Sequence, residues 1–261
     1  KNLNIVASGD VTLNGAGVSA EDGIVVETTN VTIDGIEIAQ FSDDGIDVRG
    51  DNLDPRQIEI VNVTSRLNGG NNIVIFSSQA EDTVELTNVV SRNSGNLPEG
   101  AESGDGILIF SETVIINNTT STGSEDVGLD IFAGEEGTVS IRQSTVSDNG
   151  IDNFEDDAEA GIRINSAQQI TVENTTTTGN LQNGLEVSTS DATTGGRTMN
   201  FTDVTSRANG FNGAFIGGTA DADAVSIANS RFDQNDDDGL ETQVESVNIA
   251  QTNLTRNTLA G

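Results

Sequence analysis

Short acidic runs are the part of this chain whose residue types and spacing are best suited to chemistry. They lie at 43–44, 125–126, 135–136, 155–157 and 236–238. Hard cations such as Ca²⁺ take about six to eight oxygen ligands at roughly 2.3–2.6 Å, and a compact acidic turn can supply several of them. We therefore expect Ca²⁺ as a cofactor, with Asp236, Asp237 and Asp238, or Asp156 and Asp157, as its ligands. The alternative is that these turns are simply solvated in a salt-adapted protein.

Several residue types that enzymes commonly use are absent. The chain has no His, Cys, Tyr or Trp, and Lys1 is its only lysine. Without His and Cys there is no imidazole base, no thiolate and no disulfide framework, and without Tyr and Trp the usual sugar-stacking rings are missing. We therefore assign no catalytic residue, and the composition favours a protein without enzymatic activity.

The net charge of the chain is −31, from 42 acidic and 11 basic residues. Nucleic acids and anionic membranes both bind basic surfaces, so neither is expected as a partner. No apolar run approaches the length of about 18 residues that spans a bilayer, which predicts that the chain does not insert into a membrane. The chain starts inside an apolar-alternating stretch and stops at Gly261 in mid-repeat, which we interpret as a segment of a longer or self-stacking exported protein.

A repeat runs along the whole chain and must position these acidic turns. Each repeat has a stretch of alternating apolar residues, a polar residue, a Ser/Thr-rich segment, and then a Gly that opens a second alternating stretch. Examples of the first stretch are 58–62, 84–88 and 114–118, and examples of the second are 45–48, 106–109 and 161–164. Period-two alternation with one apolar face indicates β-strands, and the Gly suits a positive φ or a close backbone approach at a corner. Repeats that cannot close their own core must stack on their neighbours, so the fold is a solenoid.

This repeat resembles the right-handed parallel β-helix of the pectin-lyase-like superfamily, in its generic form, over essentially the whole chain. The resemblance implies an all-β fold in which residues 1–261 form a single right-handed parallel β-helix of about nine to ten rungs. It is specific for the fold and not for an activity, because such repeats carry lyases, hydrolases, epimerases, adhesins and phage tail proteins. Polygalacturonase-type hydrolases and alginate epimerases require His or Tyr, whereas pectate-lyase-like chemistry requires only Ca²⁺, acids and an Arg.

Two polar positions recur in every repeat and predict ladders of stacked side chains. The first ladder contains Asn62, Asn88, Asn118, Asn174 and Asn229, with Gln143, Asp203 and Gln251 at the equivalent place. The second, six residues later, contains Asn68, Ser94, Ser124, Asn149, Asn180, Asn209, Asn235 and Asn257. Stacked amides can hydrogen-bond along a solenoid and satisfy backbone groups at its corners. We interpret both ladders as structural.

Alternation also predicts which side chains lie on the outer wall. It places Val74 and Phe76, then Leu108 and Phe110, and then Phe132 outward on successive rungs, where they would form an exposed apolar stripe. Contiguous apolar residues on a surface usually mark an interface, so these five residues are the predicted contact surface. The alternative is that the chain turns a corner after 75, 109 and 131, and the Phe rings fold back into the core or under a loop.

Basic residues are expected to be paired with acids in so acidic a chain. Asp130 and Arg163 lie on successive rungs of one face and are predicted to form a cross-strand ion pair. Arg66, Arg92 and Arg207 recur four residues after the first ladder, and there too we expect ion pairing ahead of a site for anionic glycans.

These observations favour a non-enzymatic structural or adhesive module of a secreted or cell-surface protein, such as an extracellular fibre. Its expected partners are further copies of itself, joined end to end or laterally, or other surface proteins. The alternatives are a polysaccharide-active enzyme, either a Ca²⁺-assisted lyase or a hydrolase that uses Asp and Glu, and a glycan-binding module. An enzyme requires a groove with convergent acids and a base, which is the feature that discriminates these hypotheses.

Overall fold

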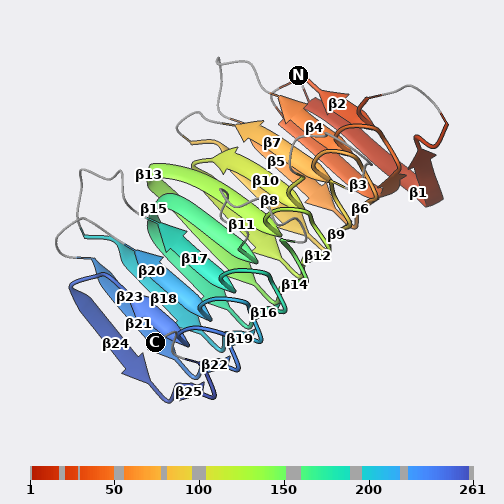
Figure 1. The fold of residues 1–261 in the computed structure, drawn as a ribbon. Helices are drawn as coiled ribbons and strands as arrows, with labels where there is room; N and C mark the ends of the chain where they lie inside the picture. The colour runs from red at the N-terminus through yellow and green to blue at the C-terminus, as the bar shows by residue number, and fades with distance from the viewer. Residues whose placement is uncertain are drawn as a thin grey trace.

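The computed structural model describes residues 2–17, 21–28, 30–49, 56–77, 81–95, 104–150, 160–188, 196–217 and 223–258. Its regular secondary structure consists of strands, and successive turns of the chain stack into one elongated solenoid with the termini at opposite ends (Figure 1). Within this part of the chain, no helix is long and apolar enough to cross a membrane. The predicted all-β class and the parallel solenoid are therefore confirmed.

Each turn of the chain crosses three faces of the solenoid, which we name A, B and C, and all strand pairs within a face are parallel. Face A stacks β2 (Ile24–Val26), β4 (Ile46–Arg49), β7 (Ile73–Ser77), β10 (Ile107–Ser111), the first parts of β13 (Leu129–Arg142) and β15 (Ile162–Glu173), β17 (Leu185–Ser188), β20 (Ala214–Gly217) and β23 (Leu240–Thr242).

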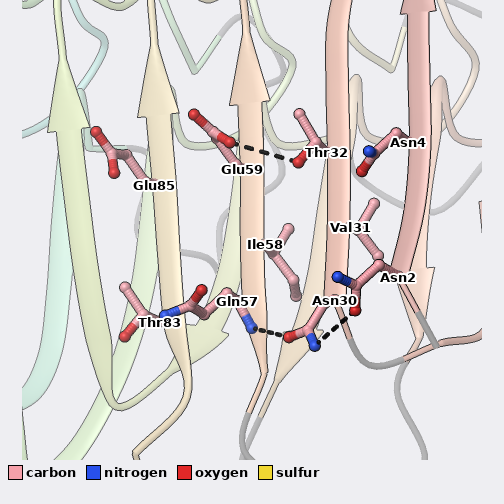
Figure 2. Close-up of a pocket in the computed structure, with 10 residues that line it drawn as sticks. All are labelled: Asn2, Asn4, Asn30, Val31, Thr32, Gln57, Ile58, Glu59, Thr83 and Glu85. Atoms are coloured by element: carbon pink, nitrogen blue, oxygen red, sulfur yellow. Dashed lines mark hydrogen bonds between the residues drawn. The ribbon is translucent and has the colours of Figure 1, made fainter.

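Face B follows face A in each turn and carries polar side chains on its outer side near the N-terminus (Figure 2). It stacks the first parts of β1 (Asn2–Asn14) and β3 (Asn30–Ala39), then β5 (Gln57–Val61), β8 (Thr83–Thr87), β11 (Thr113–Asn117), the last parts of β13 and β15, β18 (Thr198–Thr202), β21 (Ala224–Ala228) and β24 (Ser246–Ala250).

Face C is the shortest of the three faces. It stacks the last parts of β1 and β3, then β6 (Thr64–Arg66), β9 (Val90–Arg92), β12 (Thr120–Thr122), β14 (Thr145–Ser147), β16 (Thr176–Thr178), β19 (Thr205–Arg207), β22 (Arg231–Asp233) and β25 (Asn253–Thr255).

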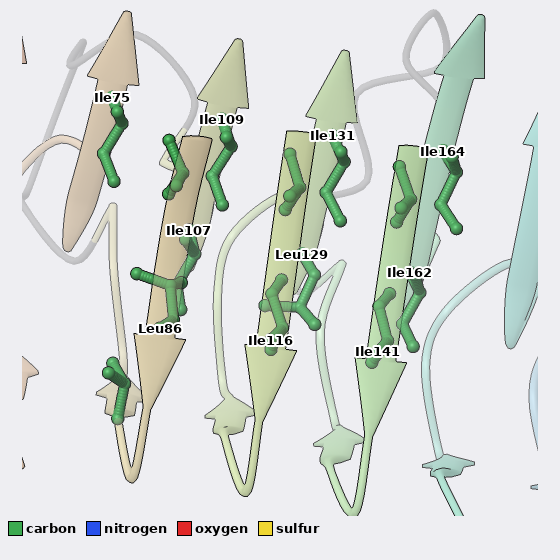
Figure 3. Packing of buried hydrophobic residues seen from close by; sticks show 14 of the residues in the cluster. Ile75, Leu86, Ile107, Ile109, Ile116, Leu129, Ile131, Ile141, Ile162 and Ile164 are labelled. Atoms are coloured by element: carbon green, nitrogen blue, oxygen red, sulfur yellow. The ribbon is translucent and has the colours of Figure 1, made fainter. Parts of the chain in front are cut away.

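Stacked aliphatic side chains fill the interior of the solenoid (Figure 3). The inward positions of face A place Ile75, Ile109, Ile131 and Ile164 in one column and Ile107, Leu129 and Ile162 in another, and face B adds Leu86, Ile116 and Ile141. All of them are 0% exposed. Because each such burial contributes roughly 1.5–3 kcal/mol, this repeated β-branched and Leu core explains why the alternating pattern folds into stacked strands.

The first predicted ladder lines the corner between faces B and C. Its residues adopt the left-handed conformation, with φ of 48° at Asn118, 55° at Asn88 and 53° at Asn62, which Asn tolerates better than most residues. Their amides are exposed and bond along the solenoid axis. Nδ2 of Asn118 donates to Oδ1 of Asn88 at 2.7 Å, and Nδ2 of Asn88 donates to Oδ1 of Asn62 at 2.9 Å. Asn174 and Asn229 occupy the same corner, with φ of 48° and 51°.

The second predicted ladder lies inside the solenoid, between faces C and A. Nδ2 of Asn149 donates to Oδ1 of Asn180, and Nδ2 of Asn180 donates to Oδ1 of Asn209, at 2.9 and 3.0 Å. This ladder also explains the Gly that opens most face A strands. A Cβ on Gly161 would lie 2.5 Å from Nδ2 of Asn180, and the φ of Gly161 is not positive. The glycine is therefore required for close approach rather than for a left-handed turn.

Candidate functional site

A third polar ladder lies at the corner where each turn enters face A. Each backbone N–H donates to the side-chain Oδ1 one turn earlier: Asp44 to Asp22 at 3.1 Å, Asn71 to Asp44 at 2.7 Å, Asp105 to Asn71 at 2.9 Å, and Val127 to Asp105 at 3.1 Å. The repeat pattern revealed the Gly that follows but not the Asp or Asn before it. The pairs 22–23, 44–45 and 105–106 were the available signal, since each reads Asp-Gly.

This third ladder brings acids from two turns of the chain together. Ligand oxygens of Asp22, Asp43 and Asp44 all lie within 4.8 Å of one another. Two oxygens bound to one Ca²⁺ are at most about 5 Å apart, because each Ca–O distance is roughly 2.3–2.6 Å. Asp43 is exposed, Asp22 is half-buried and Asp44 is buried, so the group opens to solvent on one side. Of the residues that the structure describes, these three alone form such a group of His, Cys, Asp or Glu side chains.

Asp47, on the outer side of β4, adds a fourth carboxylate beside this group. It is 0% exposed, and its Oδ2 contacts Nη2 of Arg49. Burial raises its pKa, the ion pair with Nη2 of Arg49 opposes that rise, and the charges of Asp22 and Asp43 add to it. We call Asp22, Asp43, Asp44 and Asp47 the corner cluster.

The corner cluster holds its negative charge in a poorly hydrated place. Burial raises the pKa of Asp44 to about 6, and repulsion from Asp43 and Asp47 contributes in the same direction. Hydrogen bonds from the backbone N–H and the amide of Asn71 oppose the rise without cancelling it. Carboxylates that converge while their charges are desolvated are the oxygen donors that a hard divalent cation neutralises, and Ca²⁺ fits this donor set.

The acidic turn that the sequence favoured is built differently. Backbone N–H groups of Asp236, Asp237 and Asp238 bond to Asn209, Phe211 and Asn212 of the preceding turn. Within the described ranges, their carboxylates are not part of a converging group of three. In the corner turn Asp44 stacks on an acid of the preceding turn, Asp22, whereas Asp238 stacks on an amide, Asn212. Asp156 and Asp157 lie outside the described residues.

The predicted apolar stripe lies on the outer side of face A. Phe76, Phe110 and Phe132 stack on one another, with ring centroids 4.9 and 4.5 Å apart and interplanar angles of 16° and 5°. Phe76 is 43% exposed, and the other two rings are half-buried. The neighbouring column is covered, since Val74 is 2% exposed and Leu108 is half-buried. The rings therefore lie on the outer wall rather than in the core. Phe110 stacks on Phe76 with one face and on Phe132 with the other.

Asp130 and Arg163 form the predicted cross-strand ion pair. Nε and Nη2 of Arg163 donate to the two carboxylate oxygens of Asp130 at 2.9 and 2.6 Å, and Asp130 is 1% exposed. Beside them, burial raises the pKa of Asp105 well above its usual value, and the charges of Asp130 and Asp126 add to the rise. Both acids thus lie next to the one guanidinium, which favours their ionised forms.

The other recurring arginines have mixed partners. Nε of Arg66 donates to Glu37 at 2.7 Å, as expected for an ion pair. Nε of Arg207 instead bonds the amide oxygen of Gln234 at 2.7 Å and lies 3.9 Å from Asp233.

Comparisons with known proteins agree with this geometry. A family model described as right handed beta helix region matches residues 22–194. The crystal structure of the pectate lyase Pel9A is similar to this chain, with a TM-score of 0.55 and 19% sequence identity, over 94% of this chain and 61% of the lyase chain. At that identity the likeness shows a shared fold, and this chain spans about three fifths of the length of the lyase. No curated protein matches the sequence. From its repeats, its parallel stacking and the family match together, the chain belongs to the right-handed β-helix family.

Proposed function

We propose that this chain is a calcium-binding β-helix module of an exported cell-surface or extracellular-fibre protein, without catalytic activity of its own. The observation that carries the proposal is the corner cluster. Asp22, Asp43 and Asp44 converge within the reach of one ion, and the buried Asp47, whose carboxylate pairs with Arg49, lies beside them.

Calcium would act there as a clamp between two turns of the solenoid. Asp22 precedes β2, whereas Asp43 and Asp44 precede β4 on the next turn, so one ion joins consecutive turns. Neutralising the desolvated carboxylates removes the repulsion that now raises the pKa of Asp44. Ligand that binds only the folded state stabilises it by about 2.7 kcal/mol at a concentration of 100 Kd.

Isothermal titration calorimetry with Ca²⁺, together with thermal unfolding followed by circular dichroism, tests this proposal. Circular dichroism is the suitable probe because the chain lacks Trp and Tyr. We expect Ca²⁺ to bind and to raise the unfolding temperature of the native chain, and D43N/D44N to abolish both effects. The matched control is D236N/D237N, which removes the same charge from the other acidic turn and should leave both effects intact. Calcium binding that survives D43N/D44N would contradict the assignment.

A Ca²⁺-assisted lyase is the second candidate, and the nearness of Arg49 to the corner cluster is the observation that favours it. In such chemistry a bound Ca²⁺ acidifies the proton next to a uronate carboxylate, and a neighbouring base removes it. Arg49 is a poor base, because its hydrogen bond and ion pair with Asp47 raise its pKa above the ordinary arginine value. General bases work best with a pKa near the operating pH, so the geometry supports binding better than catalysis.

Incubation with polygalacturonate and Ca²⁺ distinguishes the two candidates. A lyase releases products with a new carbon–carbon double bond, which absorbs in the ultraviolet. We expect no such absorbance from the native chain. A product signal that disappears in Arg49→Ala would instead establish the lyase and overturn the non-catalytic proposal.

Lateral contact between copies of the module would use the Phe76–Phe110–Phe132 stack. Phe76 exposes 43% of its surface at one end of the stack, so it can contact a neighbour without breaking the stack. Sedimentation velocity over a concentration series, on the native chain and on Phe76→Gln, checks this part. We expect self-association that Phe76→Gln weakens, and a native chain that stays monomeric at all concentrations would exclude it.

A further inference from the structure

A polar groove crosses face B over β1, β3, β5 and β8, on a different face from the corner cluster (Figure 2). Its volume is about 360 Å³, within the usual range of ligand sites of roughly 300–1,000 Å³. Strand register arranges its outward side chains in two rows. One row is Asn2, Asn30, Gln57 and Thr83, and the other is Asn4, Thr32, Glu59 and Glu85.

The first row is partly pre-organised. Nδ2 of Asn30 donates to Oδ1 of Asn2 at 3.2 Å, and the same Asn30 accepts the backbone N–H of Gln57 on its own Oδ1 at 3.1 Å. The side-chain amide of Gln57 makes no hydrogen bond to another described residue, and it is exposed. This row therefore presents a fixed edge that ends in an available amide donor and acceptor.

The second row contains a like-charge pair. Glu59 and Glu85 are direct register partners on neighbouring parallel strands, which lie about 4.8 Å apart. Thr32 Oγ1 donates weakly to Glu59 at 3.4 Å, and neither carboxylate forms an ion pair with a described residue. Like charges directly opposite each other destabilise a sheet, and elsewhere this solenoid pairs opposite charges across turns, as in Arg142 and Glu173. The groove thus keeps two carboxylates as open acceptors at a cost in stability.

We propose that this groove binds an uncharged, hydroxyl-rich oligosaccharide whose chain runs along the solenoid axis, across the strands. Sugar hydroxyls donate to carboxylates and exchange hydrogen bonds with amides, which are the groups on offer here. The spacing between strands is close to the length of one pyranose along an extended chain, so each turn of the solenoid meets about one sugar unit. Glu59 and Glu85 then contact neighbouring units of the ligand.

The lining selects against two other ligand classes. Among the described residues that line the groove none is basic, so an anionic glycan would face Glu59 and Glu85 without compensation from them. A bare divalent cation would have only this pair of carboxylates, since the converging group of three acids in the described residues lies at the corner cluster. None of the described lining residues is aromatic either, so the affinity that they provide rests on hydrogen bonds and is low.

Titration followed by nuclear magnetic resonance, with EDTA present so that the corner cluster is not involved, tests the proposal. The probes are cellohexaose and xylohexaose, with hexagalacturonate as the anionic comparison. We expect binding of at least one uncharged hexaose and none of hexagalacturonate. Glu85→Ala should weaken binding at least about tenfold, since a charge-assisted hydrogen bond contributes roughly 1.5–3 kcal/mol and 1.4 kcal/mol corresponds to tenfold. Gln57→Ala removes neutral hydrogen bonds, which contribute roughly 0.5–1.5 kcal/mol each, and should weaken binding about two- to tenfold. The control Glu136→Ala, an exposed acid outside the groove, should have no effect.

The double variant E59Q/E85Q separates sugar binding from cation binding. Gln keeps hydrogen-bonding capacity and the size of Glu but removes its charge, so E59Q/E85Q should bind the hexaose more weakly than the native chain and more tightly than E59A/E85A. Equal binding of hexagalacturonate, absence of binding by both uncharged hexaoses, or binding that Gln57→Ala and Glu85→Ala leave unchanged would each overturn the proposal. Because EDTA is present throughout, its failure leaves the calcium proposal untouched.

Discussion

Arg163 donates two hydrogen bonds to the carboxylate of Asp130 on the neighbouring turn of face A, from Nε at 2.9 Å and from Nη2 at 2.6 Å. Asp130 is almost fully buried, and the buried Asp105 beside it is held with a raised pKa by desolvation and by the charge of Asp130. The guanidinium therefore compensates two acids at once. Removing it would leave a buried carboxylate unpaired and return the repulsion between the two aspartates.

The first prediction concerns this pair. Arg163→Met should lower the free energy of unfolding by about 2–4 kcal/mol, because breaking a buried pair leaves an uncompensated charge. Arg142→Met is the matched control, since the Arg142–Glu173 pair is nearly half exposed on both sides and should contribute less than about 1 kcal/mol. Urea unfolding followed by circular dichroism measures both. Equal losses of unfolding free energy in the two variants would show that the burial of Asp130 does not account for the contribution of this ion pair to stability.

Much of the fold follows from the sequence because alternation is a local signal. An inward Ile such as Ile109 stacks on Ile131 of the next turn, so the same pattern repeats wherever a rung begins. Whether the side chains of the first ladder point into the solenoid or out of it could not be inferred in this way. Asn118 adopts φ of 48°, and alternation between inside and outside does not continue through a left-handed residue. The repeat alone therefore could not place this ladder on the outer corner.

The candidate site was harder to predict for a different reason. Asp22 and Asp44 are 22 residues apart and meet only because one turn of the solenoid separates them. Variable turn lengths hide that alignment, whereas the run of acids at 236–238 is visible directly. Convergence across turns depends on register, and register becomes visible only when the strands are paired.

The second prediction separates the two Asn ladders. Asn180→Ala removes the side chain that bonds Asn209 and accepts both the amide and the backbone N–H of Asn149, so buried polar groups lose their partners. We expect a loss of about 3–4 kcal/mol in unfolding free energy. Asn118→Gly should stay within about 1 kcal/mol of the native chain, because its amide is exposed and Gly adopts a φ of 48° without strain. Thermal unfolding of the two variants should therefore rank them clearly, and the opposite ranking would contradict the internal role of Asn180.

The third prediction concerns the aromatic stack. Phe110 lies between Phe76 and Phe132 and contacts a ring on each side. Phe110→Leu keeps an apolar side chain but removes both ring contacts, and it should destabilise the fold by about 1–2 kcal/mol. A double-mutant cycle with Phe132→Leu measures the coupling. Additive losses would show that the rings are neighbours without a stacking contribution.

The fourth prediction follows from the pKa of Asp44, which burial raises to about 6 from an unfolded value of 3.8. A carboxyl whose folded pKa is raised contributes stability that is fully present below the unfolded pKa and is lost as the pH rises through the folded pKa. Without Ca²⁺, the unfolding temperature should therefore rise as the pH falls from 7.5 to about 5. Asp44→Asn should flatten part of that rise, and the remainder comes from Asp47 and Asp105, whose pKa values are raised in the same direction.

Calcium must reverse this dependence if it binds the corner cluster, because it requires the ionised form of Asp44. The stabilisation by Ca²⁺ should be large at pH 7.5 and smaller by about 1.4 kcal/mol at pH 5, because the affinity falls about tenfold per pH unit once Asp44 binds a proton. Thermal unfolding at pH 5.0, 6.0 and 7.5, each with Ca²⁺ and with EDTA, measures the difference directly. A calcium effect of constant size over that range would mean that the ion binds elsewhere, because a site that includes Asp44 has to compete with its proton.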